Sequence, residues 1–118
     1  GVGGVPAVTV LPQATAKILS SHNGAFTSRA LFPFGDDRKT EFYELRLAAG
    51  AEENAPPHPI GTVENLIVTA GAIDIEREGK AFHLETGDAI QFEADVAHSY
   101  RNRGAKQAIM YLVMSYLK

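Results

Sequence analysis

The feature that most constrains this fold is the alternation of apolar and polar residues with a period of two. Tyr43, Leu45 and Leu47 share one parity within residues 39–47, and no stretch shows the sustained spacing of three and four residues typical of an amphipathic helix. Turn-forming pairs such as Asn23-Gly24 and Glu78-Gly79 separate the alternating stretches, at spacings of about 8–12 residues. The pattern predicts an all-β sandwich or barrel with little helix.

The expected strands lie between such turns. They cover residues 16–20, 25–32, 39–47, 62–69, 72–77, 80–84, 88–92, 98–101 and 106–116. Residues 22–24 are expected to form a hairpin turn, residues 34–38 a second turn, and residues 48–61 a long loop rich in proline, glycine and acid. The strand at 106–116 is apolar on both faces, so we expect a second sheet or a partner subunit to cover its outer face.

Length and the character of the first residues suggest the domain organisation. With 118 residues the chain fits one domain. Residues 1–7, Gly-rich and without amphipathic period, are expected to be a flexible lead-in or linker, followed by a single domain at 8–118. Because the chain begins at Gly1 rather than Met, we expect either the C-terminal part of a longer protein or a processed or tagged chain.

Composition excludes several classes of function. The chain has no cysteine, which rules out disulfides, thiolate metal ligands and a cysteine nucleophile. Its formal net charge is −3, and its 11 Lys and Arg are scattered rather than gathered in the basic stripe of a nucleic-acid surface. No apolar run approaches the roughly 18 residues of a membrane span. We therefore expect neither direct DNA binding nor a membrane partner.

The four histidines have different surroundings in the sequence. His22 lies in a turn, and alternation points His83 away from the core. His58 stands within Pro56-Pro57-His58-Pro59, where the prolines restrict the backbone and so help to aim the imidazole. His98 opens a later strand.

Glu64 is the strongest local anomaly, because it shares a strand face with Leu66 and Val68. A carboxylate on an apolar face is costly to desolvate unless a cation or hydrogen bonds meet it. Two imidazoles and one carboxylate from separate segments are a plausible ligand set for a metal, so we expect His58, Glu64 and His98 to meet in a small-molecule pocket. The alternative is that the two histidines are hydrogen-bonded pocket residues and Glu64 pairs with one of them.

The spacing of these residues resembles the two short motifs of the cupins. The first motif is matched by Gly50, His58, Glu64 and Gly71, with Ile60 standing where a second histidine is usual. The second is matched by Gly87-Asp88, His98 and Asn102. The resemblance covers residues 39–116 and implies a double-stranded β-helix, or jelly-roll, barrel.

The resemblance also implies a metal, with three departures. Carried over, the ligands are His58, Glu64 and His98, and the metal would be Zn²⁺ or Fe²⁺. The replacement at Ile60, a longer spacing before His58 and Glu93-Ala94-Asp95 in place of Pro-x-Gly depart from the pattern. The first departure weakens the expected affinity, so both a metal-bound and a metal-free site stay open.

A narrower resemblance concerns function. The runs at 41–45, 57–64, 87–92 and 95–102 resemble the C-terminal sensor domain of bacterial helix-turn-helix regulators of the XRE type. This implies a cytoplasmic domain that senses a small molecule, forms a homodimer and acts on DNA only through a separate N-terminal domain. The alternatives are a small cupin metalloenzyme of dioxygenase or isomerase type, which we regard as second to the sensor, and a metal-free binding or storage module.

Further pocket residues follow from alternation. Tyr43, Phe92 and Tyr100 are candidate ligand contacts, each with core packing as the competing role, and Tyr100 is the candidate proton donor of an enzyme. Arg46 reaches a ligand only if its strand has the opposite parity. Asn102 and Asp88 are interpreted as turn residues.

Overall fold

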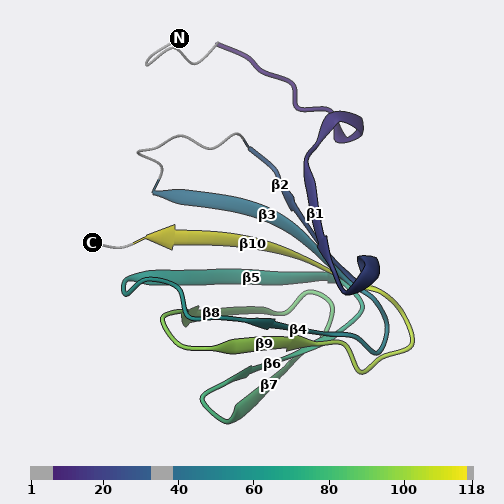
Figure 1. Ribbon diagram of the computed structural model, residues 1–118, viewed down its shortest axis with the longest axis vertical. Coiled ribbons are helices and arrows are strands. Elements are labelled where there is room, and N and C mark those ends of the chain that lie inside the picture. The colour runs from purple at the N-terminus through teal and green to yellow at the C-terminus, as the bar shows by residue number, and fades with distance from the viewer. Residues whose placement is uncertain (1–6, 33–38, 117–118) are drawn as a thin grey trace.

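The computed structural model describes residues 7–32 and 39–116, which form two antiparallel sheets (Figure 1). The expected turn at 34–38, and the lead-in except Ala7, lie outside the described residues. The larger sheet has the order β1-β2-β3-β10-β5-β8 and the smaller sheet the order β4-β9-β6-β7. The strands are β1 (Ile18–Ser21), β2 (Phe26–Ala30), β3 (Thr40–Leu47), β4 (Glu52–Ala55), β5 (Thr62–Ala70), β6 (Ile73–Arg77), β7 (Lys80–Leu84), β8 (Ala89–Glu93), β9 (His98–Arg101) and β10 (Ala108–Tyr116).

The core lies between the sheets and is built from alternate residues of each strand. Along β10 the even-numbered residues from Ala108 to Met114 are buried, and along β5 the buried positions are Thr62, Glu64, Leu66 and Val68. The residues that face them from the smaller sheet include Ile73, Ile75 and Tyr100. The chain is thus all-β with two packed sheets, as the alternation predicted, and it has the jelly-roll form that the resemblance to the cupins implied.

The expectation of a loop throughout 48–61 was wrong. Residues Glu52–Ala55 form β4, which pairs with β9 so that Ala55 lies opposite His98 and Glu53 opposite Tyr100. Two glutamates and an asparagine carry no strand signal of their own. The backbone hydrogen bonds to β9, which is distant in sequence, hold these residues in a strand despite their low strand propensity. The same pairing places β4 beside the site residues of β9.

The turns around β1, β2, β6 and β7 were predicted in the right places. His22, Asn23 and Gly24 join β1 to β2 and all have positive φ, as a hairpin connection between these strands requires. Glu78 and Gly79 join β6 to β7 with φ values of 51° and 78°. The first strand is shorter than expected at its start, because Gln13–Thr15 form a 3₁₀ turn before it.

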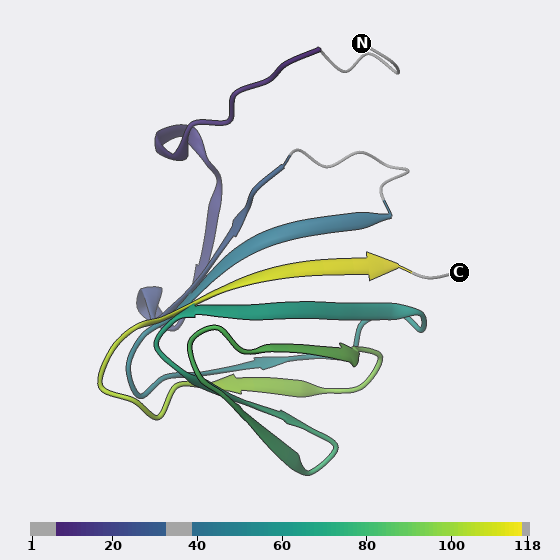
Figure 2. The ribbon, with the colours of Figure 1, turned by 180° about the vertical axis from the view of Figure 1, so that it is seen from behind.

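One end of the barrel collects the termini of several strands. The start of β5, the end of β8 and the end of β10 meet there in the larger sheet, and the start of β9 faces them (Figures 1 and 2). Strands β1 and β2 diverge from β4 over most of their length (Figure 2). The two sheets are linked where β1 ends, because the Ser21 hydroxyl donates to Glu53 of β4. No described helix is long and apolar enough to span a membrane.

Candidate functional site

Three separate segments bring His58, Glu64 and His98 together at this end of the barrel. His58 precedes β5 and is anchored where its N–H donates to Ala94 O at 2.9 Å. Glu64 is the third residue of β5, and His98 is the first residue of β9. One potential ligand atom from each of the three lies within 4.8 Å of the others. The juxtaposition expected from the sequence is therefore present.

Glu64 is the centre of this cluster and is almost fully buried. The Nε2 atom of His98 lies 3.0 Å from Glu64 Oε2, and Nε2 of His58 lies 3.4 Å from the same oxygen. The other oxygen, Oε1, accepts a hydrogen bond from the Tyr100 hydroxyl. The side chains of Glu64 and His98 are 1% and 0% exposed, whereas that of His58 is 29% exposed. His58 is consequently the member of the cluster through which solvent or a ligand has access.

The tautomer and charge of His98 follow from its two contacts. Its Nδ1 lies 2.9 Å from Val96 O, and a carbonyl can only accept, so Nδ1 carries a hydrogen. Burial lowers the pKa of His98, but the hydrogen bonds to Glu64 and Val96 and the charge of Glu64 outweigh it, so the pKa is raised. Once Nε2 loses its proton, its lone pair faces Glu64 and is free to bind a metal.

Phe92 and Tyr100, the candidate ligand contacts, lie against the ring of His98. The centroid of Phe92 lies 5.2 Å from that of His98, and the Tyr100 ring lies 5.6 Å away, both edge-on. Tyr100 is buried, and its hydroxyl donates to Glu64 rather than to backbone. Burial and the nearby charge of Glu64 raise its pKa well above that of an ordinary tyrosine. Tyr100 therefore holds its proton tightly and serves to position the Glu64 carboxylate.

A second carboxylate, which sequence reasoning missed, lies in the same row of the larger sheet. Met114 of β10 is opposite Glu41 on β3 and opposite Glu64 on β5, so both acids share the inward face. The Tyr43 hydroxyl donates to Glu41, whereas the Tyr116 hydroxyl donates to Met114 Sδ at 3.4 Å. Burial and the charge of Glu41 raise the pKa of Tyr116 to about 12. Glu41 lies on the same face of β3 as Tyr43, and this alternation is the sequence signal from which Glu41 could have been identified as a site residue.

Other candidates lie away from the cluster. Ile60 is 90% exposed, so the residue at the usual second-histidine position does not line the site. His83 is exposed and bonds to Asp74 and Glu85, as expected for a residue pointing outward. Asn102 donates to Leu47 O and Lys106 O and accepts from Gly104 N–H, which confirms its role in the turn.

Arg46 does not reach the site, because its strand has the parity that was expected. It lies on the outer face of the larger sheet beside Glu44, which is 6% exposed and is also bonded by Arg29 and Tyr111. Burial alone would raise the pKa of Glu44, but these three hydrogen bonds hold it below its ordinary value. Asp88 accepts from Glu85 N–H at 2.9 Å and is a turn residue, as predicted.

A jelly-roll barrel with a buried His-Glu-His cluster at one end defines the class of protein. Comparison with known proteins agrees: the cupin domain family matches residues 43–114. The chain belongs to the cupin family.

Relatives of known sequence or structure include regulators. The chain is 30% identical over 106 residues to the HTH-type transcriptional regulator SutR of Escherichia coli K12, covering 89% of this chain and 60% of that protein. The crystal structure of the cupin domain of an XRE family transcriptional regulator from Enterobacter cloacae matches with a TM-score of 0.75 and 26% identity, over 80% of this chain and 99% of that one.

Another solved structure shares the fold. The structure titled FeII HppE has a TM-score of 0.75 at 17% identity, covering 92% of this chain and 60% of that one. At this identity the likeness concerns the fold alone. The chain is thus a cupin domain related to those of regulators.

Proposed function

We propose that this domain is the small-molecule sensor of an XRE-type transcriptional regulator. The observation that carries the proposal is the buried cluster around Glu64, held at the barrel end by Tyr100 and His98. The 30% identity to the transcriptional regulator SutR supports the proposal. The chain spans 60% of the length of that regulator. DNA binding belongs to a separate helix-turn-helix domain of the longer protein, and the domain works in the cytoplasm as a homodimer. A ligand with different affinities for two states of the regulator would bias the attached domain.

A divalent metal, zinc or iron, fits the residues of the cluster. Two imidazole nitrogens and a carboxylate oxygen are borderline donors that suit either ion. The hydrogen on His98 Nδ1 is held by Val96 O, which directs Nε2 to the site in the manner common for metal-binding histidines. When bound, the metal would supply a Lewis-acidic position for an oxygen or nitrogen of the ligand. His58, Glu64 and His98 would hold it.

The charges near the cluster favour an amino-acid-like ligand over a purely anionic one. Glu41 lies in the same row as Glu64, and Glu53 lies opposite Tyr100 on the facing sheet. Glu53 lies 3.2 Å from His22 Nε2 and Glu41 accepts a hydrogen bond from Tyr43, but among the described residues neither acid forms an ion pair with a Lys or Arg. A positively charged nitrogen on the ligand would meet this negative potential favourably. Tyr43 and Phe92 are the proposed ring contacts of such a ligand.

A cupin metalloenzyme is the second candidate, and the likeness of the barrel to FeII HppE supports it. The protonation and hydrogen bonding of the Tyr100 hydroxyl argue against its acting as a proton donor in such an enzyme. Its raised pKa makes it a poor acid near neutral pH, and its hydroxyl is already committed to Glu64. A metal-free binding or storage module is the third candidate, and it differs from a metal-binding sensor both in the metal measurement and in the DNA-affinity test described below.

Metal analysis tests the cluster directly. Zinc and iron would be measured in the purified protein and in a His58→Ala, His98→Ala variant, after passage through a zinc-containing and a zinc-free buffer. We expect near-stoichiometric metal in the parent and loss of most of it in the variant. A His22→Ala, His83→Ala variant is the matched control, because both residues lie outside the cluster, and it should keep its metal. Equal, substoichiometric metal in all three proteins would reject the metal site.

The regulatory part has its own test. The reading frame before Gly1 should encode a helix-turn-helix domain. A metabolite that raises the melting temperature of the isolated cupin domain should also change the DNA affinity of the full-length regulator. A frame that starts at this domain, or a metabolite that stabilises the domain and leaves DNA affinity unchanged, would refute the sensor proposal.

A further inference from the structure

The free edges of the two sheets leave a core-facing aromatic ring uncovered. Strand β7 is an edge of the smaller sheet and β8 an edge of the larger one, and both lie below β5 in Figure 1. Phe82 of β7 lies directly opposite the buried Ile75 of β6, so it projects from the core-facing side of its sheet. Phe82 is nevertheless 43% exposed. The interior of the barrel is therefore accessible to solvent between these two edges.

A hollow of about 390 Å³ lies at this opening. Phe82 contributes to its wall from β7, and Ile90 and Phe92 contribute from β8. The volume is within the range of small-molecule sites, roughly 300–1,000 Å³. The ring of Phe92 also lies against that of His98, with 5.2 Å between the centroids. The hollow consequently adjoins the cluster around Glu64 and has an apolar wall of its own.

Two cations lie next to each other where the β6–β7 turn bounds the hollow. Arg77 and Lys80 both line it, and they are directly opposite each other in the register of β6 and β7. Like charges at opposite positions of neighbouring strands repel, so this pairing is unfavourable until an anion lies between them. In the described part of the chain, Glu78 is the only carboxylate that pairs with either cation, and its side chain is 63% exposed. Such an exposed pair contributes little to holding the two cations together.

The Arg77 guanidinium keeps donors available for a further acceptor. Its Nε donates to Glu93 O at 2.8 Å, and its Nη1 donates to Glu78 Oε1 at 3.0 Å. A guanidinium has five N–H groups, and within residues 7–32 and 39–116 the remaining ones of Arg77 have no acceptor. The bond to Glu93 O holds the side chain against the end of β8. Arg77 is thus already positioned to receive an anion.

We propose that this hollow is a second small-molecule site and that it takes an organic monocarboxylate with an apolar body. The carboxylate would lie between Arg77 and Lys80, and the apolar body would lie between Phe82 and Phe92. Charge complementarity identifies the head group, because two cations and one acid, Glu78, leave a single excess positive charge in the wall. The two phenylalanine rings identify the body, since large apolar surfaces gain most from being covered.

The site goes beyond the amino-acid-like ligand of the proposed function. Glu41 and Glu53, the acids that favour a cationic nitrogen, lie on β3 and β4. In the larger sheet β3 and β8 are on opposite sides of β5, and in the smaller sheet β4 and β7 are the two opposite edges. Phe92 is shared by the two sites. Occupancy of the hollow depends neither on a metal nor on an attached DNA-binding domain.

Calorimetric titration of the chelator-treated protein with octanoate tests the site. The matched probes are 1-octanol and octylammonium, which keep the alkyl chain and remove or reverse the charge. We expect saturable binding of one octanoate per chain, with a dissociation constant at least about tenfold below that of 1-octanol, and no saturable binding of octylammonium. No saturable octanoate binding below its micelle-forming concentration overturns the proposal, as does equal affinity for octanoate and 1-octanol.

Three variants then locate the bound octanoate. Lys80→Glu and Lys106→Glu change the net charge equally at exposed positions, and Lys106 follows β9, which begins beside Arg77 and runs to the other end of the barrel. We expect Lys80→Glu to raise the dissociation constant of octanoate about tenfold, because a repulsion replaces an attraction, and Lys106→Glu to change it less than about twofold. Phe82→Ala should weaken octanoate and 1-octanol alike, by about fivefold.

Thermal unfolding followed by circular dichroism checks that the three variants fold. Unchanged octanoate affinity in Lys80→Glu overturns the proposal, and so does an equal loss in Lys80→Glu and Lys106→Glu, which would indicate an effect of net charge alone. Unchanged affinity in Phe82→Ala also overturns it, because the apolar body would then lie elsewhere. None of these results alters the metal measurement or the DNA-affinity test, so the second site and the proposed function can fail separately.

Discussion

Replacing Glu64 by Gln tests whether the buried cluster is electrostatic in origin. Gln keeps the size of the side chain, but its NH₂ group only donates, so one of the two carboxylate oxygens that meet His98 and Tyr100 is lost as an acceptor. Breaking a buried pair by removing one charge typically costs 3–5 kcal/mol, and the retained amide oxygen offsets part of this. We therefore expect a loss of about 3 kcal/mol in the free energy of unfolding at pH 6, equivalent to a melting temperature lower by about 12 °C.

The pH dependence of that loss follows from the raised pKa of His98. A group with a raised pKa in the folded state stabilises the fold fully below its unfolded value, 6.5 for histidine, and loses this contribution as the pH rises through the folded value. The difference in stability between the parent and Glu64→Gln should consequently be smaller at pH 9 than at pH 6. Metal must first be removed with a chelator, so that protons alone occupy Nε2.

Urea unfolding followed by far-UV circular dichroism is the suitable assay, because the chain has no tryptophan. Glu44→Gln is the matched control, being the other buried carboxylate with several donors. Its pKa is lowered, so its contribution is present above the unfolded value of 4.5 and is lost only as the pH falls. Its stability difference should not change between pH 6 and pH 9. A Glu64→Gln difference below about 1 kcal/mol at pH 6, or one that grows toward pH 9, would refute the reasoning.

Three other substitutions test single features of the fold. Ile60→His should leave zinc stoichiometry and affinity unchanged in a metal titration, since this position is 90% exposed; a gain in affinity would contradict the placement of Ile60. Gly71→Ala should lower the unfolding free energy by about 1–3 kcal/mol, because Gly71 has φ +70° and its Cβ would lie 2.8 Å from Gln107 O; a neutral result in urea unfolding would count against this contact. Asn102→Ala should cost about 2 kcal/mol in the same assay, because it leaves Leu47 O and Lys106 O without this donor, and a loss confined to metal binding would indicate a ligand role instead.

The sequence predicted most strands because their burial has a period of two. Leu66 and Val68 are buried on the face that they were assigned, and so is Glu64. The strand β4 was not predicted, because its residues Glu52–Ala55 acquire strand structure from pairing with β9 rather than from their own propensity. Proline, glycine and acid near this segment indicated a loop, and only the long-range partner overrides that signal.

The three residues of the site could be named from their chemistry, whereas their neighbours could not. A carboxylate among apolar residues and a histidine held between prolines are anomalies visible in one dimension. The second acid of the site, Glu41, is ordinary in sequence and becomes notable because β10 places it in register with Glu64. The exposure of Ile60 likewise depends on how the loop before β5 turns.

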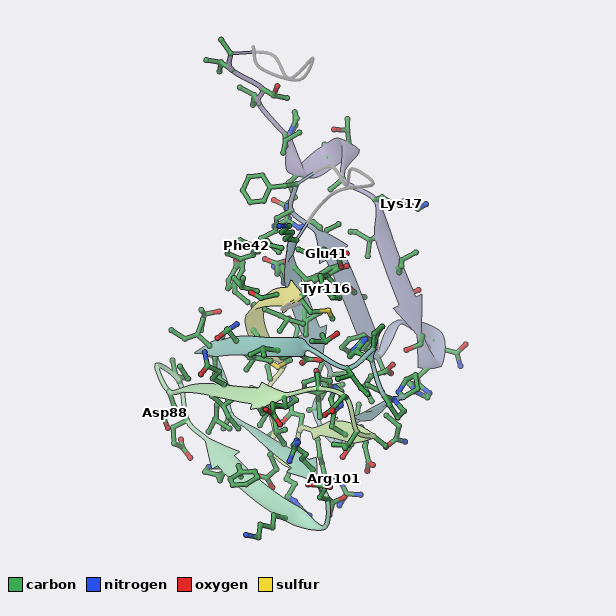
Figure 3. The ribbon with its side chains drawn as sticks, turned by 90° about the vertical axis from the view of Figure 1, so that its left-hand side faces the viewer. Lys17, Glu41, Phe42, Asp88, Arg101 and Tyr116 are labelled. Atoms are coloured by element: carbon green, nitrogen blue, oxygen red, sulfur yellow. The ribbon has the colours of Figure 1, made fainter. Side chains whose placement is uncertain are left out.

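The sequence by itself determined the class of fold and the residues that meet at Glu64, since alternation and desolvation act on local patterns. Tertiary structure decided which oxygen each donor reaches, that Tyr100 bonds to the carboxylate, and that residues 7–17 extend away from the two sheets (Figure 3). These depend on strand order and register between segments far apart in the chain, and a one-residue change in register would move every side chain of a strand to the opposite face.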